Sequence, residues 1–121
     1  MTTKVDGTNG IVFPDSTTQA TAAISPKAWI TFNGISGVST LASYNCSATR
    51  NSTGDYTISF TSALSDANYA VVFGAQQPSA SSSTTISIKT GTTPTSSSFT
   101  ITTWNVGSQA DLTRISIVVF R

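Results

Sequence analysis

The chain of 121 residues contains no histidine and no glutamate, and it has a single cysteine. Without histidine there is no ordinary Ser-His-Asp or Cys-His pair for nucleophilic catalysis. One cysteine without histidine also supplies too few ligands for a zinc site. These absences exclude most hydrolytic and metal-dependent mechanisms, and we expect no enzyme activity, no metal and no cofactor.

The acidic groups that remain are five aspartates, and a pair of carboxylates can hydrolyse a glycoside. They are Asp6, Asp15, Asp55, Asp66 and Asp111. Four of them adjoin turn-forming residues, where an aspartate side chain commonly bonds the local backbone. We interpret them as turn and cap residues, and a small glycosidase is the alternative.

Charge of either sign is scarce. Charged residues make up 9% of the chain and the net charge is +1, whereas about a quarter of an average soluble domain is charged. The six basic residues are scattered, so we expect neither nucleic-acid binding nor insertion into a membrane. Serine and threonine instead supply about a third of the residues, and such uncharged hydrophilic composition is typical of extracellular adhesive surfaces.

The single cysteine, Cys46, cannot form a disulfide within the chain. It alternates with Ala42, Tyr44 and Ala48, which predicts an inward-facing position on a strand. We interpret it as a small buried thiol. An interchain disulfide or a reactive thiol is the alternative.

Apolar and polar residues alternate in many short runs, and no helical period is sustained, which predicts strands. Turn residues separate seven such runs, at 28–32, 41–49, 55–61, 69–75, 84–89, 99–104 and 114–120. This spacing indicates an all-β fold, an antiparallel β-sandwich over residues 27–121, with a small jelly roll as a variant. The last run is apolar on both faces, so we expect a central strand or one that contacts a neighbouring chain.

Residues 1–26 form a separate arm that is too poor in apolar residues to build a core. Its one apolar cluster is Ile11, Val12 and Phe13, between turn residues on both sides. The predicted sandwich has strands enough for its own core. We therefore expect these three residues to make contacts with other copies of the chain or with a docking partner.

Sugar-binding proteins stack aromatic side chains on pyranose rings and bond the hydroxyls with amide and carboxylate groups. The best cluster of that kind is Trp104 and Asn105, with Gln109, Asp111 and Arg114 nearby. Trp104 falls on the opposite strand face from Phe99 and Ile101, so we expect it to point away from the core. The alternative is that Trp104 packs against a neighbouring chain. We interpret the other tryptophan, Trp29, as a structural anchor.

Several short motifs occur in one order along the chain: VDGTNGIVFPD (5–15), TQATA (18–22), WITFNG (29–34), SYN (43–45), GDYTISF (54–60) and DANYAVV (66–72). In this order they resemble bacteriophage tail-fibre and related virion appendage proteins, in which a similar arm precedes a small β-rich terminal domain. The resemblance implies a homotrimer that contacts other tail or capsid proteins and recognises a host-surface glycan. A structural knob or capsid decoration protein without a ligand is the alternative. No signal peptide is recognisable, so we expect synthesis in the host cytoplasm and a final location on the virion.

Overall fold

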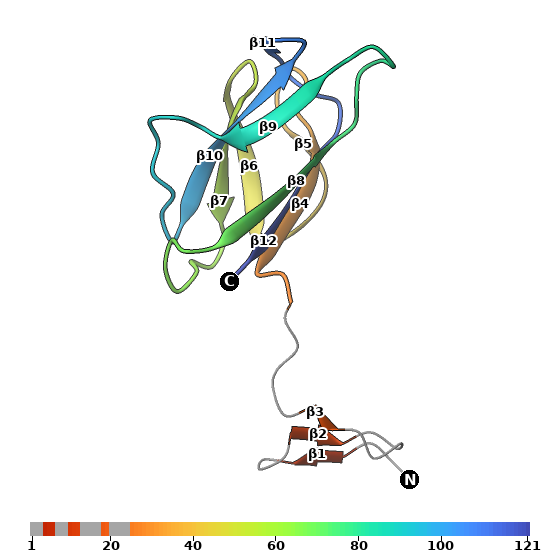
Figure 1. Ribbon diagram of the computed structural model, residues 1–121. Coiled ribbons are helices and arrows are strands. Elements are labelled where there is room, and N and C mark those ends of the chain that lie inside the picture. The colour runs from red at the N-terminus through yellow and green to blue at the C-terminus, as the bar shows by residue number, and fades with distance from the viewer. Residues whose placement is uncertain (1–3, 7–9, 13–17, 20–24) are drawn as a thin grey trace.

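The computed structural model describes residues 4–6, 10–12, 18–19 and 25–121 (Figure 1). The described residues form twelve strands and no helix. Their bounds are β1 Lys4–Asp6, β2 Gly10–Val12, β3 Thr18–Gln19, β4 Ala28–Asn33, β5 Ser39–Tyr44, β6 Cys46–Ser52, β7 Asp55–Phe60, β8 Ala70–Ala75, β9 Thr84–Ile88, β10 Ser98–Asn105, β11 Ser108–Gln109 and β12 Ile115–Phe120. Nothing in this part of the chain is a helix long and apolar enough to cross a membrane.

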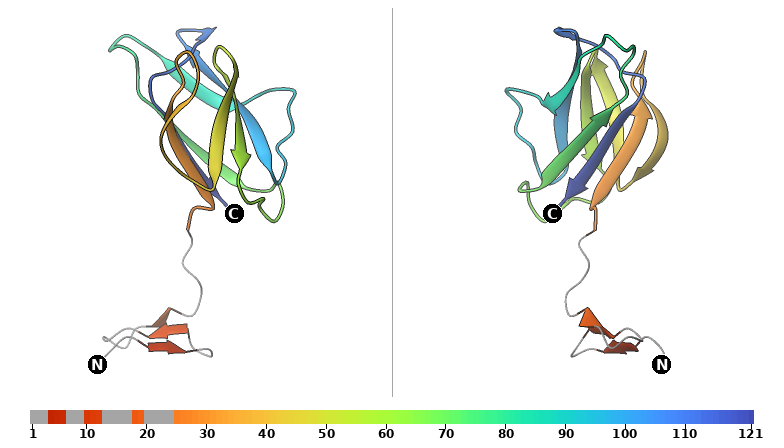
Figure 2. Two further views of the ribbon diagram at one scale, coloured as in Figure 1. Left: turned by 180° about the vertical axis from the view of Figure 1, so that it is seen from behind. Right: turned by 45° about the vertical axis from the view of Figure 1, so that its right-hand side comes forward.

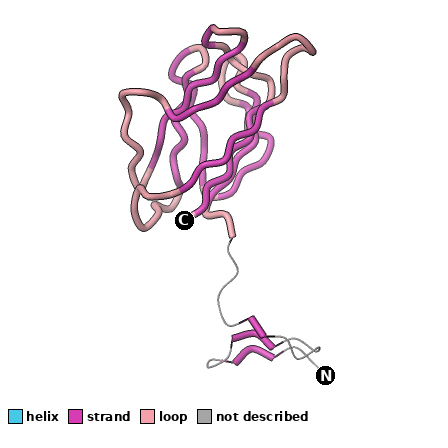
Figure 3. The backbone as a smooth tube through the Cα atoms, viewed as in Figure 1, coloured by secondary structure: helices cyan, strands magenta, loops and turns pink. Residues whose placement is uncertain are grey.

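Residues 25–121 form the all-β fold that the alternating pattern predicts, with two antiparallel sheets (Figure 2). One is four-stranded, in the order β5-β4-β12-β8. The other is five-stranded: β6, β7 and β10 follow one another, β9 lies on the far side of β10, and the short β11 pairs with the last residues of β10. The loops of the sandwich gather at its two ends (Figure 3).

The strand order is not that of the jelly-roll variant. A jelly roll winds one long hairpin around both sheets, so its second strand pairs with its seventh. Here the second strand of the sandwich, β5, pairs with β4, and hairpins join β4 to β5, β6 to β7 and β9 to β10. Three pairs of consecutive strands are thus hydrogen-bonded neighbours, so the sandwich does not have the jelly-roll topology.

The core lies between the two sheets and is built from the inward half of each alternating strand. Its fully buried side chains include Ile30 and Phe32 from β4, Tyr56 and Ile58 from β7, Ile101 from β10, and Ile115, Ile117 and Val119 from β12. Strand β12 pairs with β4 on one side and β8 on the other, so the prediction of a central last strand is confirmed.

The run predicted as one strand over 41–49 is two strands in different sheets, β5 and β6, separated at Asn45. Asn45 has φ +54°, a left-handed conformation that asparagine tolerates better than most residues. Its amide donates to the carbonyls of Lys27 and Ser62 and its Oδ1 accepts from the Ser62 backbone N–H, which fixes the corner.

This corner overturns part of the predicted alternation. Cys46 is buried, but Ala42 and Tyr44, predicted on the same inward face, are exposed. A change of sheet at Asn45 breaks the period of two, so positions on either side of it do not share a face.

The arm contributes a small antiparallel sheet, with β1 paired to β2 and β2 to β3. Ile11 and Val12 lie in β2, and Phe13 lies outside the described residues. The chain enters the sandwich beside the end of β12, where the Lys27 N–H donates to the Val119 carbonyl at 2.8 Å. A domain boundary between residues 26 and 27 stays a prediction.

Candidate functional site

Three of the predicted site residues meet at one hairpin. Trp104 and Asn105 end β10, the chain turns through Val106 and Gly107, and Trp104 pairs with Gln109 across the ladder. Val106 and Gly107 have φ +48° and +79°. Positive φ at both turn residues is the signature of a tight hairpin that matches the twist of its strands.

Trp104 lies on the outer face of the five-stranded sheet and is 38% exposed, as predicted from its position opposite Phe99 and Ile101. Its cross-strand neighbours are Gln109 on β11 and Thr85 on β9, both exposed. An aromatic face is thus flanked by an accessible amide and an accessible hydroxyl. Sugar-binding proteins use groups of these three kinds.

The Asn105 side chain is less accessible to a ligand than those of Trp104 and Gln109. Its Oδ1 is buried and has no hydrogen-bond partner among residues 25–121. A ligand cannot reach this oxygen without a movement of the hairpin, so Gln109 is the accessible amide of the cluster.

Asp111 lies in an internal network behind the hairpin rather than on the surface beside Trp104. Its Oδ1 accepts from the Tyr56 hydroxyl at 2.6 Å and from the Gly54 backbone N–H at 2.9 Å. Arg50 adds an ion pair at 2.9 Å to Oδ2. Burial raises the pKa of Asp111, but the hydrogen bonds from Arg50, Gly54 and Tyr56 outweigh it and the pKa is lowered.

The Asp111 network connects the turn before β12 to the β6–β7 hairpin, and two glycines let it form. Gly54 has φ +65°, and a Cβ there would lie 2.6 Å from the Thr103 carbonyl oxygen. A Cβ on Gly34 would lie 2.3 Å from the Tyr56 hydroxyl. Both contacts are too close for any side chain, so the loops around the network are held in one arrangement.

The rest of the outer face of the five-stranded sheet is lined almost entirely by hydroxyl groups. Directly opposite residues point to the same side of a sheet, and the pairings place serines and threonines in cross-strand rows. The rows are Ser47–Ser59–Ser98, Thr49–Thr57–Thr100, Asp55–Thr102–Ser87 and Trp104–Thr85. We call this surface the hydroxyl face. This face was not predicted from the sequence, although the polar half of each alternating run carries the serines and threonines that form it.

One charged pair lies within the hydroxyl face. The Asp55 carboxylate, whose side chain is 7% exposed, pairs with the Lys89 ammonium. It also accepts from the Asn51 amide at 2.9 Å, and the same amide donates to Thr57. Burial raises the pKa of Asp55, but the hydrogen bonds from Lys89 and Asn51 outweigh it and leave the pKa lowered.

The hairpin that carries Trp104 lies at one end of the sandwich, which we call the tip. The C-terminus and the residues where the chain enters the sandwich lie at the other end (Figure 1). Backbone bonds tie the tip loops to one another, from Gly34 N–H to the Leu112 carbonyl and from Val106 N–H to the Ser83 carbonyl.

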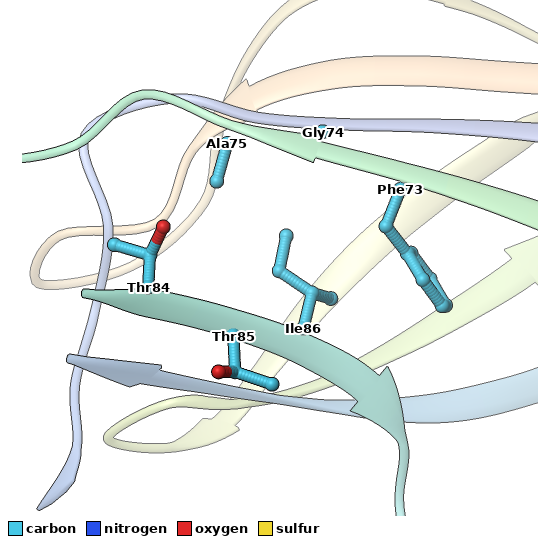
Figure 4. A pocket seen from close by; sticks show the side chains of 6 residues that line it. All are labelled: Phe73, Gly74, Ala75, Thr84, Thr85 and Ile86. Carbon is cyan, nitrogen blue, oxygen red and sulfur yellow. The ribbon is translucent and has the colours of Figure 1, made fainter. Parts of the chain in front are cut away.

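A cavity of about 290 Å³ opens near the tip, between strands β8 and β9 (Figure 4). It is lined by Phe73, Gly74, Ala75, Thr84, Thr85 and Ile86. The side chains of Thr84 and Ile86 point into it from β9, whereas Thr85 points away. Its volume is just below the range for small-molecule sites, about 300–1,000 Å³, and its lining carries no charge.

Cys46 is 5% exposed, and burial raises the pKa of its thiol to about 11. The described residues hold no cluster of three or more histidine, cysteine or acidic side chains that would bind a metal ion.

Comparisons with protein-family models, with curated proteins and with solved structures gave no match to this chain.

Proposed function

We propose that this chain is a non-enzymatic virion protein, the head of a bacteriophage tail fibre or related appendage, which binds an uncharged saccharide of the host surface at its tip. One observation carries the binding part of this proposal. Trp104 is exposed on the hydroxyl face, beside Gln109 and Thr85, at the end of the sandwich farthest from where the chain enters it.

The chemistry suits a neutral sugar. The Trp104 ring offers a flat apolar surface for the C–H face of a pyranose, and its electron-rich face attracts those polarised hydrogens. Gln109 and Thr85 supply a donor and acceptors within one cross-strand step of the ring. The cavity between β8 and β9 takes no part in this site, because the Thr85 side chain points away from it.

The position at the tip suits an adhesive head. A protein anchored through its arm presents the far end of its sandwich to another surface. Each such site is small and would bind weakly, but three copies joined in one particle raise the effective concentration for the second and third contacts. We propose that a homotrimer supplies this multivalency, with Ile11, Val12 and Phe13 joining its copies or docking them on other virion proteins.

A glycan array probed with the full chain tests the binding site. Trp104→Ala should lose the signal. Ser47→Ala, which removes an exposed hydroxyl from the row of the hydroxyl face farthest from Trp104, should keep it. Equal signals from wild type and Trp104→Ala would refute the tip site. No adsorption of the chain to any glycan or host cell would favour the structural knob.

A further inference from the structure

The outer face of the four-stranded sheet carries a continuous row of apolar side chains. Tyr44 pairs with Trp29, Trp29 with Val118, and Val118 with Val72, so the row crosses all four strands. Tyr44 is 57%, Trp29 36% and Val72 55% exposed. We call these four residues the apolar stripe.

The rows on either side leave the stripe accessible. On one side, the next row consists of small residues, Ala42, Thr31, Ser116 and Gly74. The Thr31 and Ser116 hydroxyls form a hydrogen bond with each other at 3.1 Å. A second copy could therefore bury this pair, and the two hydroxyls would keep a hydrogen bond. On the other side, Phe120 pairs with Ala70. The face is therefore flat and apolar, with little polar surface to desolvate.

No strand of this face carries a charged residue: the outward positions of β4, β5, β8 and β12 are all neutral. The charges nearest to it lie beyond the strand ends, at Lys27 before β4 and at Arg114 before β12, where Arg114 shares a hollow with Gly74 and Ser116. Two ion pairs of the sandwich, Lys89–Asp55 and Arg50–Asp111, involve strands of the other sheet. When a surface packs on a second copy of itself, any charge on it brings the same charge into the interface, so a neutral face is the one that can do so without repulsion.

Strand β5, at the edge of this face, is open to pairing or packing. All six of its residues are exposed, and from Trp29 through Thr49 the sequence has no charged residue and no proline. Monomeric β proteins usually protect an exposed edge with lysine, proline or a covering segment, because a bare edge associates with other chains. Among residues 25–121 no strand pairs with the outer edge of β5. Its one protective feature is a bulge opposite Thr31 and Phe32.

The exposed area fits the apolar centre of an interface. From their exposed fractions, the aromatic and valine side chains of the stripe present on the order of 300 Å², as large as the biggest patch on many monomers. A standard interface covers about 800 Å² per partner with a more polar rim. The neighbouring rows of small and hydroxyl-bearing residues supply that rim.

We propose that the apolar stripe is a contact between copies of this chain, with the aromatic half (Tyr44 and Trp29) of one copy on the aliphatic half (Val118 and Val72) of the next. The large rings lie at one side of the sheet and the smaller side chains, next to Gly74, at the other. In this contact the large aromatic side chains of one copy fill the space above the small side chains of its neighbour. It deepens the proposed homotrimer and rests on it: in a threefold ring each copy turns its aromatic half to one neighbour and its aliphatic half to the other, which adds to the contacts made by the arm.

Disulfide trapping in the full chain tests the contact. The double variant Tyr44→Cys/Val72→Cys should form covalent oligomers under mild oxidation, at least tenfold more than either single variant, because each bond joins residue 44 of one copy to residue 72 of another. The natural Cys46 is buried and should give little background. The matched control is Thr49→Cys/Ser87→Cys, with both residues exposed on edge strands of the other sheet.

A second variant tests the same contact without cysteine. Val72→Asp places a charge on the stripe at an exposed position and should raise the dissociation constant of the oligomer at least tenfold, whereas Thr49→Asp should leave it unchanged. Trapping no greater than in the control pair would overturn the inference, as would an unchanged dissociation constant.

These outcomes are separable from those of the proposed function. An oligomer that survives Val72→Asp and is not trapped would mean that the arm alone holds it, with the homotrimer intact. A monomeric Val72→Asp variant that still binds a single saccharide would leave the tip site intact.

Discussion

Tyr56 on β7 donates its phenolic hydrogen to Asp111, 55 residues later in the chain, at 2.6 Å. The Gly34 carbonyl lies 3.0 Å from the same hydroxyl, so one buried tyrosine connects the β4–β5 turn to the segment that precedes β12. Phe32 packs edge-on against the Tyr56 ring, with centroids 5.3 Å apart. The tip hairpin with Trp104 therefore rests on a fixed base.

Removal of the Asp111 charge should destabilise the sandwich strongly. Asp111→Asn removes the ion pair with Arg50, whose side chain is 28% exposed, and weakens the bonds from Gly54 and the buried Tyr56. Leaving a buried hydrogen-bonding group without its partner costs about 1–3 kcal/mol. We expect a loss within that range, measured as the free energy of unfolding in urea. Asp66→Asn, which removes the surface pair with Arg121, is the control and should change little. An equal loss in both variants would contradict the role of the network.

The same network predicts an acid-labile fold. The pKa values of Asp55 and Asp111 are lowered in the folded chain relative to about 3.9 in an unfolded one. The folded state therefore binds fewer protons, and the stabilisation is present above the unfolded pKa and lost as pH falls through the folded pKa. Urea midpoints should be level from pH 7 to 5 and fall steeply below pH 4. Asp111→Asn should fall less steeply over that interval.

Gly34 should not tolerate a side chain. Gly34→Ala would place a Cβ 2.3 Å from the Tyr56 hydroxyl and force the buried ring to move. Overpacking of this kind costs about 1–3 kcal/mol. Gly74→Ala is the matched control, because the nearest atom to its Cβ would be at 3.8 Å, an ordinary contact. Thermal unfolding should separate the two variants, and similar melting temperatures would show that Tyr56 adapts freely.

Cys46 should be unreactive in the folded protein. Only the thiolate reacts with disulfide reagents, and burial raises the pKa of this thiol to about 11. Labelling by a chromogenic disulfide at pH 8 should be slow, and should become fast in urea above the unfolding midpoint. Fast labelling of the native chain, or a disulfide-linked dimer on a non-reducing gel, would favour the reactive or interchain alternative.

Deletion of residues 1–26 should leave a folded sandwich and weaken its association. The core and the Lys27 bond to Val119 lie entirely within the retained chain. We expect an unchanged β-sheet circular dichroism spectrum with a cooperative melt, together with a lower mass in native mass spectrometry. Loss of the cooperative melt would show that the arm belongs to the fold.

Local pattern predicted most of the strands, because alternation with period two reports which face of a strand is buried. It failed over 41–49, because the pattern cannot show that Asn45 adopts a left-handed conformation and passes the chain to the other sheet. The short strand β11 was not predicted, because two residues are too few to show an alternating pattern.

The site was predictable only in part. Trp104, Asn105 and Gln109 belong to one hairpin, so their proximity follows from a local turn. The bonds of Asp111 to Arg50 and Tyr56 join residues more than 50 positions apart, and no local sequence pattern predicts such contacts. The apolar stripe likewise depends on the register between four strands, two of which are distant in sequence.

Saccharide binding at the tip can be measured by titrating a glycan into the full chain and into its Trp104→Ala variant. The ligand is a neutral glycan chosen from the array, and the readout is isothermal titration calorimetry, with Ser47→Ala as the control. We predict that Trp104→Ala weakens binding at least tenfold, since a stacked aromatic side chain at the centre of a small site carries much of its free energy. Ser47→Ala should match the wild type. Binding that is unchanged in Trp104→Ala, or lost equally in both variants, would contradict a saccharide site at Trp104.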